Sequence, residues 1–387
     1  MTIPYGRQDI TQADIDAVVE VLRSDFLTQG PAVARFESAV ATRVGASRAV
    51  AVNSATAALH VACLALGVKE GDLLWTVPNT FVASANCGRY CGADVDFVDI
   101  DPRTWNISVS SLRTKLERAR SDGRLPKVVV PVHFGGQPTD QEAIAELAQE
   151  FDFRILEDAS HSIGAERNGE RVGSCRWSDA TVFSFHPVKI VTTGEGGMVV
   201  TNDGELADRM AMYRSHGITR DATRFVRESA GPWYYEQQQL GFNYRLTDIH
   251  AALGTSQFTR LDAYIERRNV LARRYDEALV GLPLMLPYIR PENRSAFHIY
   301  VVRLDRAATS RSQRSVVEAL RSRGIEVNLH YMPVHLQPYY RELGFQPGQF
   351  PEAERYGEEA ITLPLYPLLT EAAQDDIVRA LHELLCA

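Results

Sequence analysis

Seven short apolar runs alternate with helix-patterned segments in the first half of this chain of 387 residues. They predict strands at 49–52, 73–77, 95–98, 128–132, 153–156, 181–185 and 198–201. Strands that are apolar on both faces must be covered on both faces, which is typical of a largely parallel sheet between helices. The expected fold class is therefore α/β, with a mostly parallel seven-stranded sheet.

The pattern changes in the last third of the chain. A long helical pattern at 247–280 is followed by expected strands at 297–304 and 325–330, which alternate with helices. This order predicts a smaller α+β domain after the sheet domain. We expect an N-terminal arm and the large domain over 1–250, and the linking helix and smaller domain over 251–387.

The composition excludes several classes of protein. A net charge of −8 argues against a nucleic-acid binder, which needs a basic face. No apolar run approaches the roughly 20 residues of a membrane span. The five cysteines make no C-x-x-C pair, so we expect them to be reduced and to bind no metal. These features favour a cytoplasmic protein that holds no metal ion.

Lysine is scarce: the 41 basic residues are 37 arginines and only four lysines. Lys189 lies between an apolar run and the glycine-rich stretch 194–197. An amine nucleophile that forms a Schiff base cannot be replaced by arginine, whose guanidinium keeps its proton. A solvated surface lysine is the alternative, and it is the interpretation that we give to Lys69, Lys115 and Lys127. For Lys189 we expect chemistry.

Two strand ends carry further candidates. Asp158 follows the apolar run 153–156, where ligands bind in open α/β sheets. It can face a bound heterocycle, or it can simply cap the next segment. The run 49–52 leads into small residues that include Ser54 and Thr56, and a helix N-terminus there could hold a phosphate. An ordinary serine cap is the alternative.

Together these groups predict a site for pyridoxal 5'-phosphate. A lysine amine binds the aldehyde of this cofactor, a carboxylate keeps its ring nitrogen protonated, and a helix terminus anchors its phosphate. Phe81, just past the run 73–77, could stack on the ring, although a core position is equally compatible. Motifs of dinucleotide-binding and P-loop proteins do not follow any of the predicted strands.

With these residues the whole chain resembles the DegT/DnrJ/EryC1/StrS sugar aminotransferases, which have the aspartate aminotransferase-like (type I) fold. The stretches that carry the resemblance are TQGP at 28–31, NSATAAL at 53–59, TFVA at 80–83, VHFGGQP at 132–138, EDASH at 157–161, SFHPVK at 184–189, GFNYRLTD at 241–248 and HYMP at 330–333. Eight stretches in register make the resemblance specific, although each alone would be weak.

The resemblance implies roles for individual residues. Lys189 is expected to bind the cofactor covalently and to be catalytic, and Asp158 to pair with its ring nitrogen. The other expected cofactor contacts are Ala55, Thr56 and Ser184 at the phosphate, His161 near the phenolic oxygen, Phe81 on the ring, and Asn243, which reaches the phosphate of the partner subunit. The last of these implies a homodimer with shared active sites.

Within the family, the chain is most similar to the C4 aminotransferases of pseudaminic acid biosynthesis, on the stretches at 27–30, 186–189, 213–217, 234–236 and 240–243. The implied reaction uses L-glutamate to aminate UDP-2-acetamido-2,6-dideoxy-β-L-arabino-hexos-4-ulose. Tyr5, Thr28 and Tyr331 are candidate substrate contacts, with a structural role as the alternative for the two tyrosines. Another nucleotide-linked 4-keto sugar, a dehydratase reaction on the same cofactor, and a non-catalytic module stay open. A dehydratase branch has histidine at the lysine position, so Lys189 favours transamination.

Overall fold

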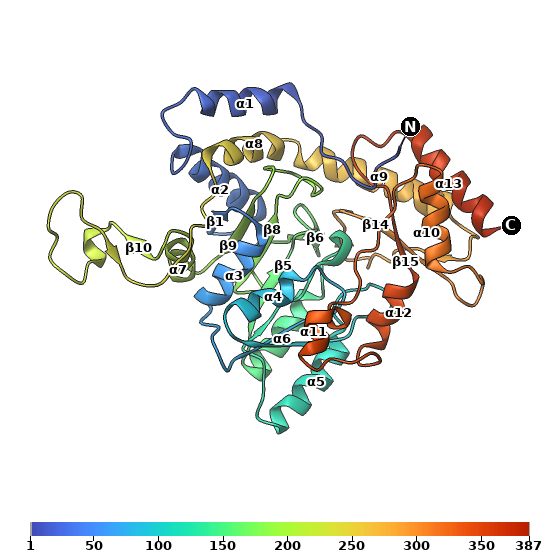
Figure 1. The fold of residues 1–387 in the computed structure, drawn as a ribbon, viewed down its shortest axis with the longest axis horizontal. Coiled ribbons are helices and arrows are strands. Elements are labelled where there is room, and N and C mark those ends of the chain that lie inside the picture. The colour runs from blue at the N-terminus through green and yellow to red at the C-terminus, as the bar shows by residue number, and fades with distance from the viewer. Residues whose placement is uncertain (1, 387) are drawn as a thin grey trace.

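The computed structural model describes residues 2–386. Its main sheet has seven strands in the order β1-β9-β8-β5-β4-β2-β3 (Figure 1). The strands are β1 (Arg48–Val52), β2 (Leu73–Thr76), β3 (Asp94–Phe97), β4 (Val128–Val129), β5 (Arg154–Asp158), β8 (Ala180–Ser184) and β9 (Gly197–Thr201). Only β9 runs against the others in this sheet. All seven predicted strands are present, and the mostly parallel α/β sheet is confirmed.

Strand β4 is shorter than the predicted run 128–132. Pro131 has no N–H to donate to a sheet ladder, so regular pairing stops before it. The chain stays extended, because Asp158 donates its N–H to the Pro131 carbonyl at 2.9 Å and Val132 forms an isolated bridge with Asp158. This keeps the end of β5 fixed where Asp158 leaves the sheet.

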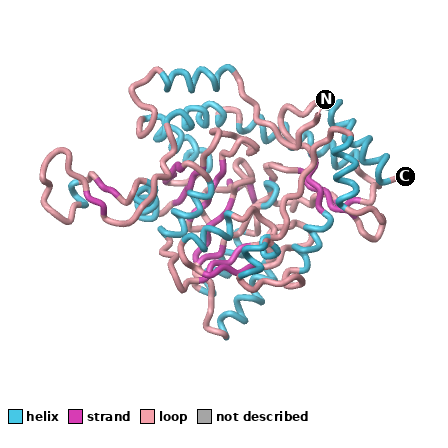
Figure 2. Tube along the Cα trace, viewed as in Figure 1, coloured by secondary structure: helices cyan, strands magenta, loops and turns pink. Residues whose placement is uncertain are grey.

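Helices cover both faces of the sheet (Figure 2). Those of the first two thirds of the chain are α1 (Gln12–Leu22), α2 (Pro31–Val44), α3 (Ala55–Ala65), α4 (Ala83–Tyr90), α5 (Val109–Ser121), α6 (Gln141–Phe151), α7 (Gly204–Arg214) and α8 (Asp248–Phe258). Val50 and Val52 of β1 belong to the core beneath α3–α6, whereas Ala51 belongs to the core beneath α2 and α8. This alternation along one strand is what a doubly covered sheet requires.

The expected helical stretch 247–280 consists of two helices, α8 and α9 (Leu261–Ala278). The break occurs at Arg260, whose φ and ψ of −103° and 5° are not helical. Its guanidinium pairs with the buried carboxylate of Asp14 on α1 at 2.7 Å. The pairing partner is 246 residues away in sequence, so the local pattern could not reveal the break.

A second sheet lies in the C-terminal part, in the order β12-β14-β15. The remaining elements there are β12 (Leu284–Met285), β14 (Tyr300–Leu304), α10 (Gln313–Ser322), α11 (Pro338–Glu342), α12 (Pro351–Glu359), β15 (Ala360–Leu363) and α13 (Glu371–Leu385). The expected strand at 325–330 is wrong, because this segment forms only isolated bridges, at Ile325 with Ile3 and at Asn328 with Thr362. The domain boundary at 250/251 stays a prediction.

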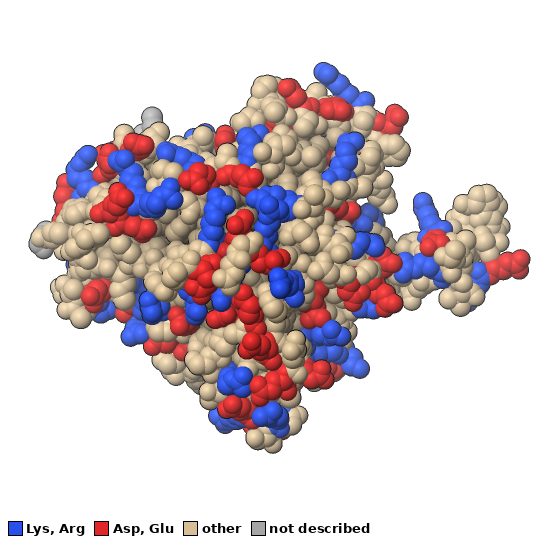
Figure 3. All heavy atoms as spheres, turned by 180° about the vertical axis from the view of Figure 1, so that it is seen from behind, with Lys and Arg blue, Asp and Glu red and all other residues tan. Residues whose placement is uncertain are grey.

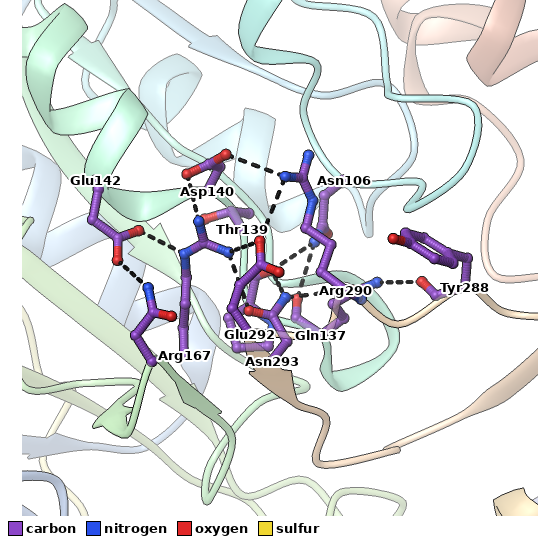
Figure 4. A network of polar contacts seen from close by, with 12 residues as sticks. Asn106, Gln137, Thr139, Asp140, Glu142, Arg167, Tyr288, Arg290, Glu292 and Asn293 are labelled. Carbon is purple, nitrogen blue, oxygen red and sulfur yellow. Dashed lines mark hydrogen bonds and ion pairs between the residues drawn. The ribbon is translucent and has the colours of Figure 1, made fainter.

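A polar network ties the segment before β14 to the first half of the chain. Arg167 on β6 (Glu166–Arg167) pairs with Asp140, Glu142 and Glu292 at 2.6–3.0 Å (Figure 4). Strand β6 lies between β7 (Glu170–Arg171) and β13 (Asn293–Arg294). One buried guanidinium thus pairs with three carboxylates, two at the start of α6 and one just before β13, which ties the segment that leads into the second sheet to the large domain.

A projecting segment leaves the body between α7 and α8 (Figures 1 and 2). It contains β10 (Ile218–Thr219) and β11 (Glu236–Gln237), which pair with each other. The segment exposes large apolar side chains, including Val226 (85% exposed) and Trp233 (76%). The body seen from behind carries interspersed charges of both signs (Figure 3). Within residues 2–386, no helix has the length and apolar character needed to cross a membrane.

Candidate active site

A cavity of about 610 Å³ lies where β5 and β8 end and α3 begins. Eight of the predicted site residues line it: Ala55, Thr56, Phe81, Asp158, His161, Ser184, Lys189 and Tyr331. They come from five stretches of sequence spread over 277 positions, from 55 to 331. The cavity therefore lies at the carboxyl ends of parallel strands, as expected for an open α/β sheet.

Lys189 lies in the loop that follows β8. The Lys189 N–H donates to the His186 carbonyl at 2.9 Å, and the loop is closed where Thr193 donates to the Phe185 carbonyl at 3.0 Å. Burial lowers the pKa of the Lys189 amine to about 8, against an opposing attraction from Asp158. A substantial neutral fraction is thus available near pH 8, as a nucleophilic amine requires.

Asp158 is the last residue of β5 and is 5% exposed. The Ser84 hydroxyl donates to its Oδ2 at 2.6 Å, and the Ser160 N–H donates to its Oδ1 at 3.1 Å. Both carboxylate oxygens therefore have a fixed partner. This holds the side chain in one orientation at the cavity wall.

Helix α3 begins at the cavity wall. The Ser54 hydroxyl accepts the Ala57 N–H at 3.1 Å and so caps the helix. The first N–H groups of a helix have no intrahelical carbonyl partner, which makes this terminus suited to an anion. Strand β9 approaches closely here: a Cβ on Gly197 would lie 2.5 Å from the backbone of Ser54 and Ala55. Only glycine permits this approach.

His161 is held between backbone and a tyrosine. Its Nδ1 accepts the Gly135 N–H at 3.3 Å, so the ring proton is assigned to Nε2, which lies 3.0 Å from the Tyr331 hydroxyl. Burial, followed by the charges of Lys189 and His330, lowers the pKa of His161 well below its usual value. His161 is therefore a neutral hydrogen-bond donor at physiological pH.

Two further histidines approach the same site. The His298 ring lies 4.4 Å from the His161 ring between centroids, and burial lowers the His298 pKa well below its usual value. Burial and the Lys189 charge lower the pKa of His330 to about 4. The three histidines around Lys189 are thus uncharged, so that they add no positive charge to the cavity.

Three predicted site residues do not line the cavity of their own chain. Asn243 is exposed and forms a bridge with Ser215, and Thr28 is exposed and forms a bridge with Thr247. The Tyr5 ring lies 5.7 Å from the His330 ring, at the edge of the site. Their roles as cofactor or substrate contacts stay predictions.

Sequence reasoning missed Ser84, His298 and His330 as site residues. Ser84 lies in the first turn of α4, 74 positions before Asp158, and no motif connects the two. His330 belongs to the HYMP stretch, which indicated the family but did not indicate that His330 lies in the site. His298 lies just before β14 and had no signal of its own.

The match to a family model decides which family the chain belongs to. The model of the DegT/DnrJ/EryC1/StrS aminotransferase family matches residues 8–382. The chain belongs to this family. The resemblance inferred from the eight stretches is therefore confirmed, as is the type I fold of pyridoxal phosphate-dependent aminotransferases.

Individual members of the DegT/DnrJ/EryC1/StrS family match over nearly the whole chain. The spore coat polysaccharide biosynthesis protein SpsC of Bacillus subtilis is 39% identical over 385 residues, which are 99% of this chain and 97% of SpsC. PseC of Helicobacter pylori, an aminotransferase involved in the biosynthesis of pseudaminic acid, has a TM-score of 0.89 and 29% identity, covering 100% of this chain and 99% of PseC.

A third relative is the sugar aminotransferase Spr1654 of Streptococcus pneumoniae in its pyridoxal phosphate form. It has a TM-score of 0.89 and 27% identity, covering 99% of this chain and 98% of that chain. Membership in the family makes this protein a sugar aminotransferase that depends on pyridoxal phosphate, with a nucleotide sugar as acceptor and a separate amino donor.

The cavity fits that cofactor. It offers an amine of lowered pKa at Lys189, a carboxylate held in place at Asp158, and a helix terminus capped by Ser54. Gly197 leaves this terminus free of side chain, because a Cβ there would collide with the backbone of Ser54 and Ala55. The amine, the carboxylate and the helix terminus are the three groups that the aldehyde, ring nitrogen and phosphate of pyridoxal phosphate need. Within residues 2–386, no group of three or more histidine, cysteine or acidic side chains is arranged to hold a metal ion.

Proposed function

We propose that this protein transfers the amino group of L-glutamate to C4 of a UDP-linked 4-keto-6-deoxy sugar. The specific acceptor that we propose is UDP-2-acetamido-2,6-dideoxy-β-L-arabino-hexos-4-ulose, in pseudaminic acid biosynthesis, and we propose the cytoplasm as the compartment. The observation that carries the proposal is the amine of Lys189 in one cavity with the carboxylate of Asp158. The likeness to PseC over the full length of both chains supports this acceptor.

When bound, pyridoxal phosphate supplies an aldehyde that takes up an amino group and a ring that accepts electrons. Asp158 would keep the ring nitrogen protonated, because its carboxylate is held facing the cavity by Ser84 and Ser160. Ala55, Thr56 and Ser184 would hold the phosphate, at the start of α3 and the end of β8. Phe81, which is 57% exposed and lines the cavity, would stack on the ring.

Lys189 has two tasks in this proposal. Its amine would hold the cofactor until the amino donor takes its place, and the freed amine would then act as base and acid. In the first half-reaction Nζ takes the proton from Cα of glutamate, and in the second it moves a proton to C4 of the sugar. The lowered pKa of about 8 suits both the removal and the delivery of a proton, because near that pH the amine is partly neutral and partly protonated.

The His161–Tyr331 pair would orient the oxygens of the bound molecules. His161 donates to Tyr331, so the phenol proton of Tyr331 is free to point to a different acceptor. Burial, with the charge of Asp158, raises the Tyr331 pKa, which keeps the phenol protonated. A carbonyl or carboxylate oxygen in the cavity is the expected acceptor.

We propose a homodimer in which Asn243 reaches the phosphate site of the partner subunit. Asn243 is exposed and lies next to the projecting segment 218–240. That segment exposes Trp233 and Leu240, which are 76% and 79% exposed. Large apolar side chains exposed on one segment are typical of a surface that another chain covers.

One alternative acceptor has an observation in its favour. SpsC, a spore coat polysaccharide biosynthesis protein, is 39% identical to this chain. A different nucleotide-linked 4-keto sugar is therefore the second candidate. A dehydratase reaction is disfavoured because Lys189 is present at the position where the dehydratase branch has histidine.

Mass spectrometry of the purified protein with a panel of UDP-linked 4-keto sugars and glutamate tests the proposal. We expect the arabino-configured 4-keto sugar to gain an amino group in place of its ketone oxygen, with formation of 2-oxoglutarate. Amination of a different 4-keto sugar alone would refute the specific acceptor. Loss of a sugar hydroxyl without gain of nitrogen would refute transamination.

A further inference from the structure

A cluster of three thiols and an imidazole lies between α3 and α4, outside the cavity. His60 and Cys63 are one turn apart on α3, and Cys87 and Cys91 are one turn apart at the end of α4. Cys63 and Cys87 are fully buried in the same core, and Cys91 packs against that core while remaining partly exposed. The two helices thus bring together thiols that are 24 to 28 positions apart.

The environment of Cys91 favours its thiolate. Hydrogen bonding from Cys63, and then from His60, lowers the pKa of Cys91 to about 6 despite its partial burial. Hydrogen bonding with Cys87 and then with Cys91, followed by burial, raises the pKa of Cys63 well above its usual value. Tyr244 holds the imidazole in place, with its hydroxyl 3.3 Å from His60 Nδ1.

Cys91 combines the features of a cysteine that reacts with peroxides. Such residues have a low pKa, are reachable from solvent and have a second thiol beside them. Cys175 provides the contrast, because burial raises its pKa to about 12 and it has no neighbouring thiol among its contacts. Cys386 is exposed near the C-terminus.

We propose that Cys91 and Cys63 form a redox-sensitive pair that a hydroperoxide converts into a disulfide between α4 and α3. The Cys91 thiolate attacks the peroxide, the O–O bond breaks, and sulfenic acid forms while the released oxygen takes a proton and leaves as water or alcohol. The Cys63 sulfur then attacks the sulfenic sulfur. The S–O bond breaks, the Cys63 proton goes to the leaving oxygen, and water is released as the disulfide forms.

Cys63 rather than Cys87 is the resolving thiol in this proposal, because Cys63 is the thiol that contacts Cys91. The bond would link two walls of the cavity. Helix α3 begins there at Ala55, and α4 carries Ser84, which donates to Asp158. Oxidation of this pair would therefore link α3 and α4 covalently, and both helices carry residues of the site.

Peptide mapping of the full-length protein tests the pair directly. The protein carries Cys386→Ser to prevent cross-linking between chains, and it is treated with hydrogen peroxide with glutathione as an internal reference. Trypsin separates the three thiols, because Lys69 and Arg89 lie between them. We expect 49–69 linked to 90–103, with the loss of two hydrogen atoms.

Three variants in the same background sharpen the test. Cys91→Ser is expected to abolish the linked peptide, and Cys87→Ser to retain it. In Cys63→Ser, sulfenic acid is expected to persist on 90–103 and to be trapped there by dimedone. The proposal is overturned if 49–69 links to 70–89 instead, or if 90–103 stays unmodified at a peroxide dose that oxidises the glutathione.

Discussion

His161 Nε2 lies 3.0 Å from the Tyr331 hydroxyl, and the two rings are stacked at 23° across the site. Because the Gly135 N–H donates to the opposite nitrogen, His161 must donate to the phenol rather than accept from it. A backbone amide in the loop after β4 therefore determines which way a tyrosine from the C-terminal part directs its proton.

Tyr331→Phe removes the acceptor of the His161 N–H. His161 is only 4% exposed, so the unpaired donor is expected to cost about 1–3 kcal/mol of unfolding free energy. Urea unfolding of the cofactor-free protein measures this loss. Tyr235→Phe, at a half-exposed tyrosine, is the control and should leave the midpoint unchanged. Equal midpoints for both variants would show that the His161–Tyr331 bond contributes nothing.

The Lys189 amine should make cofactor attachment depend on pH. With a pKa of about 8, its neutral fraction rises through that value, so attachment should become about tenfold faster between pH 7 and pH 9 and then level off. Stopped-flow absorbance of added pyridoxal phosphate measures the rate. A rate that keeps rising toward the usual lysine pKa would contradict the lowered value.

Lys189→Arg is the matched variant for that experiment. Its guanidinium keeps its proton at every accessible pH, so borohydride should fix no cofactor and turnover should be lost. Retained wild-type turnover would refute the assignment. In the wild-type protein, the Lys189 amine binds its proton more tightly in the unfolded chain than in the folded one. The contribution of Lys189 to folding stability therefore increases as the pH rises from about 8 toward the pKa of an ordinary lysine.

Ser84→Ala removes the 2.6 Å hydrogen bond to Asp158 Oδ2. A bond to a carboxylate contributes about 1.5–3 kcal/mol, so losing this orientation should weaken cofactor binding about tenfold or more. Equilibrium titration of the cofactor-free variant with pyridoxal phosphate gives the affinity. Ser322→Ala, on the exposed end of α10, is the control. Unchanged affinity in Ser84→Ala would remove Ser84 from the site.

Glu359→Gln breaks a buried ion pair in the C-terminal part. Arg303 is 2% exposed and meets Glu359 at 2.6 Å. Removing one charge leaves the other buried without a counter-ion, which costs about 3–5 kcal/mol. Calorimetric unfolding measures the effect. Glu318→Gln, in the exposed pair with Arg314, should change stability by less than about 1 kcal/mol, and equal effects at both sites would contradict the prediction.

Much of the site could be predicted because its signals are local. Asp158 ends a buried strand, Lys189 and the start of α3 each lie shortly after one, and the carboxyl ends of parallel strands meet at one edge of a sheet. The contacts made by side chains from elsewhere could not be predicted. Ser84 and His298 reach the site from α4 and from the segment before β14, where the sequence pattern only indicated packing.

The amino-acid sequence by itself determined the seven strands and singled out Lys189 as the candidate amine, because apolar runs and a lysine beside a glycine-rich stretch are properties of neighbouring residues. Tertiary structure alone decided that α8 and α9 separate at Arg260, that His161 donates to Tyr331, and that Cys63 meets Cys91. The physical reason is distance along the chain. Hydrogen bonds and pKa shifts act over a few ångströms in space, and partners that folding brings together leave no mark in the local pattern.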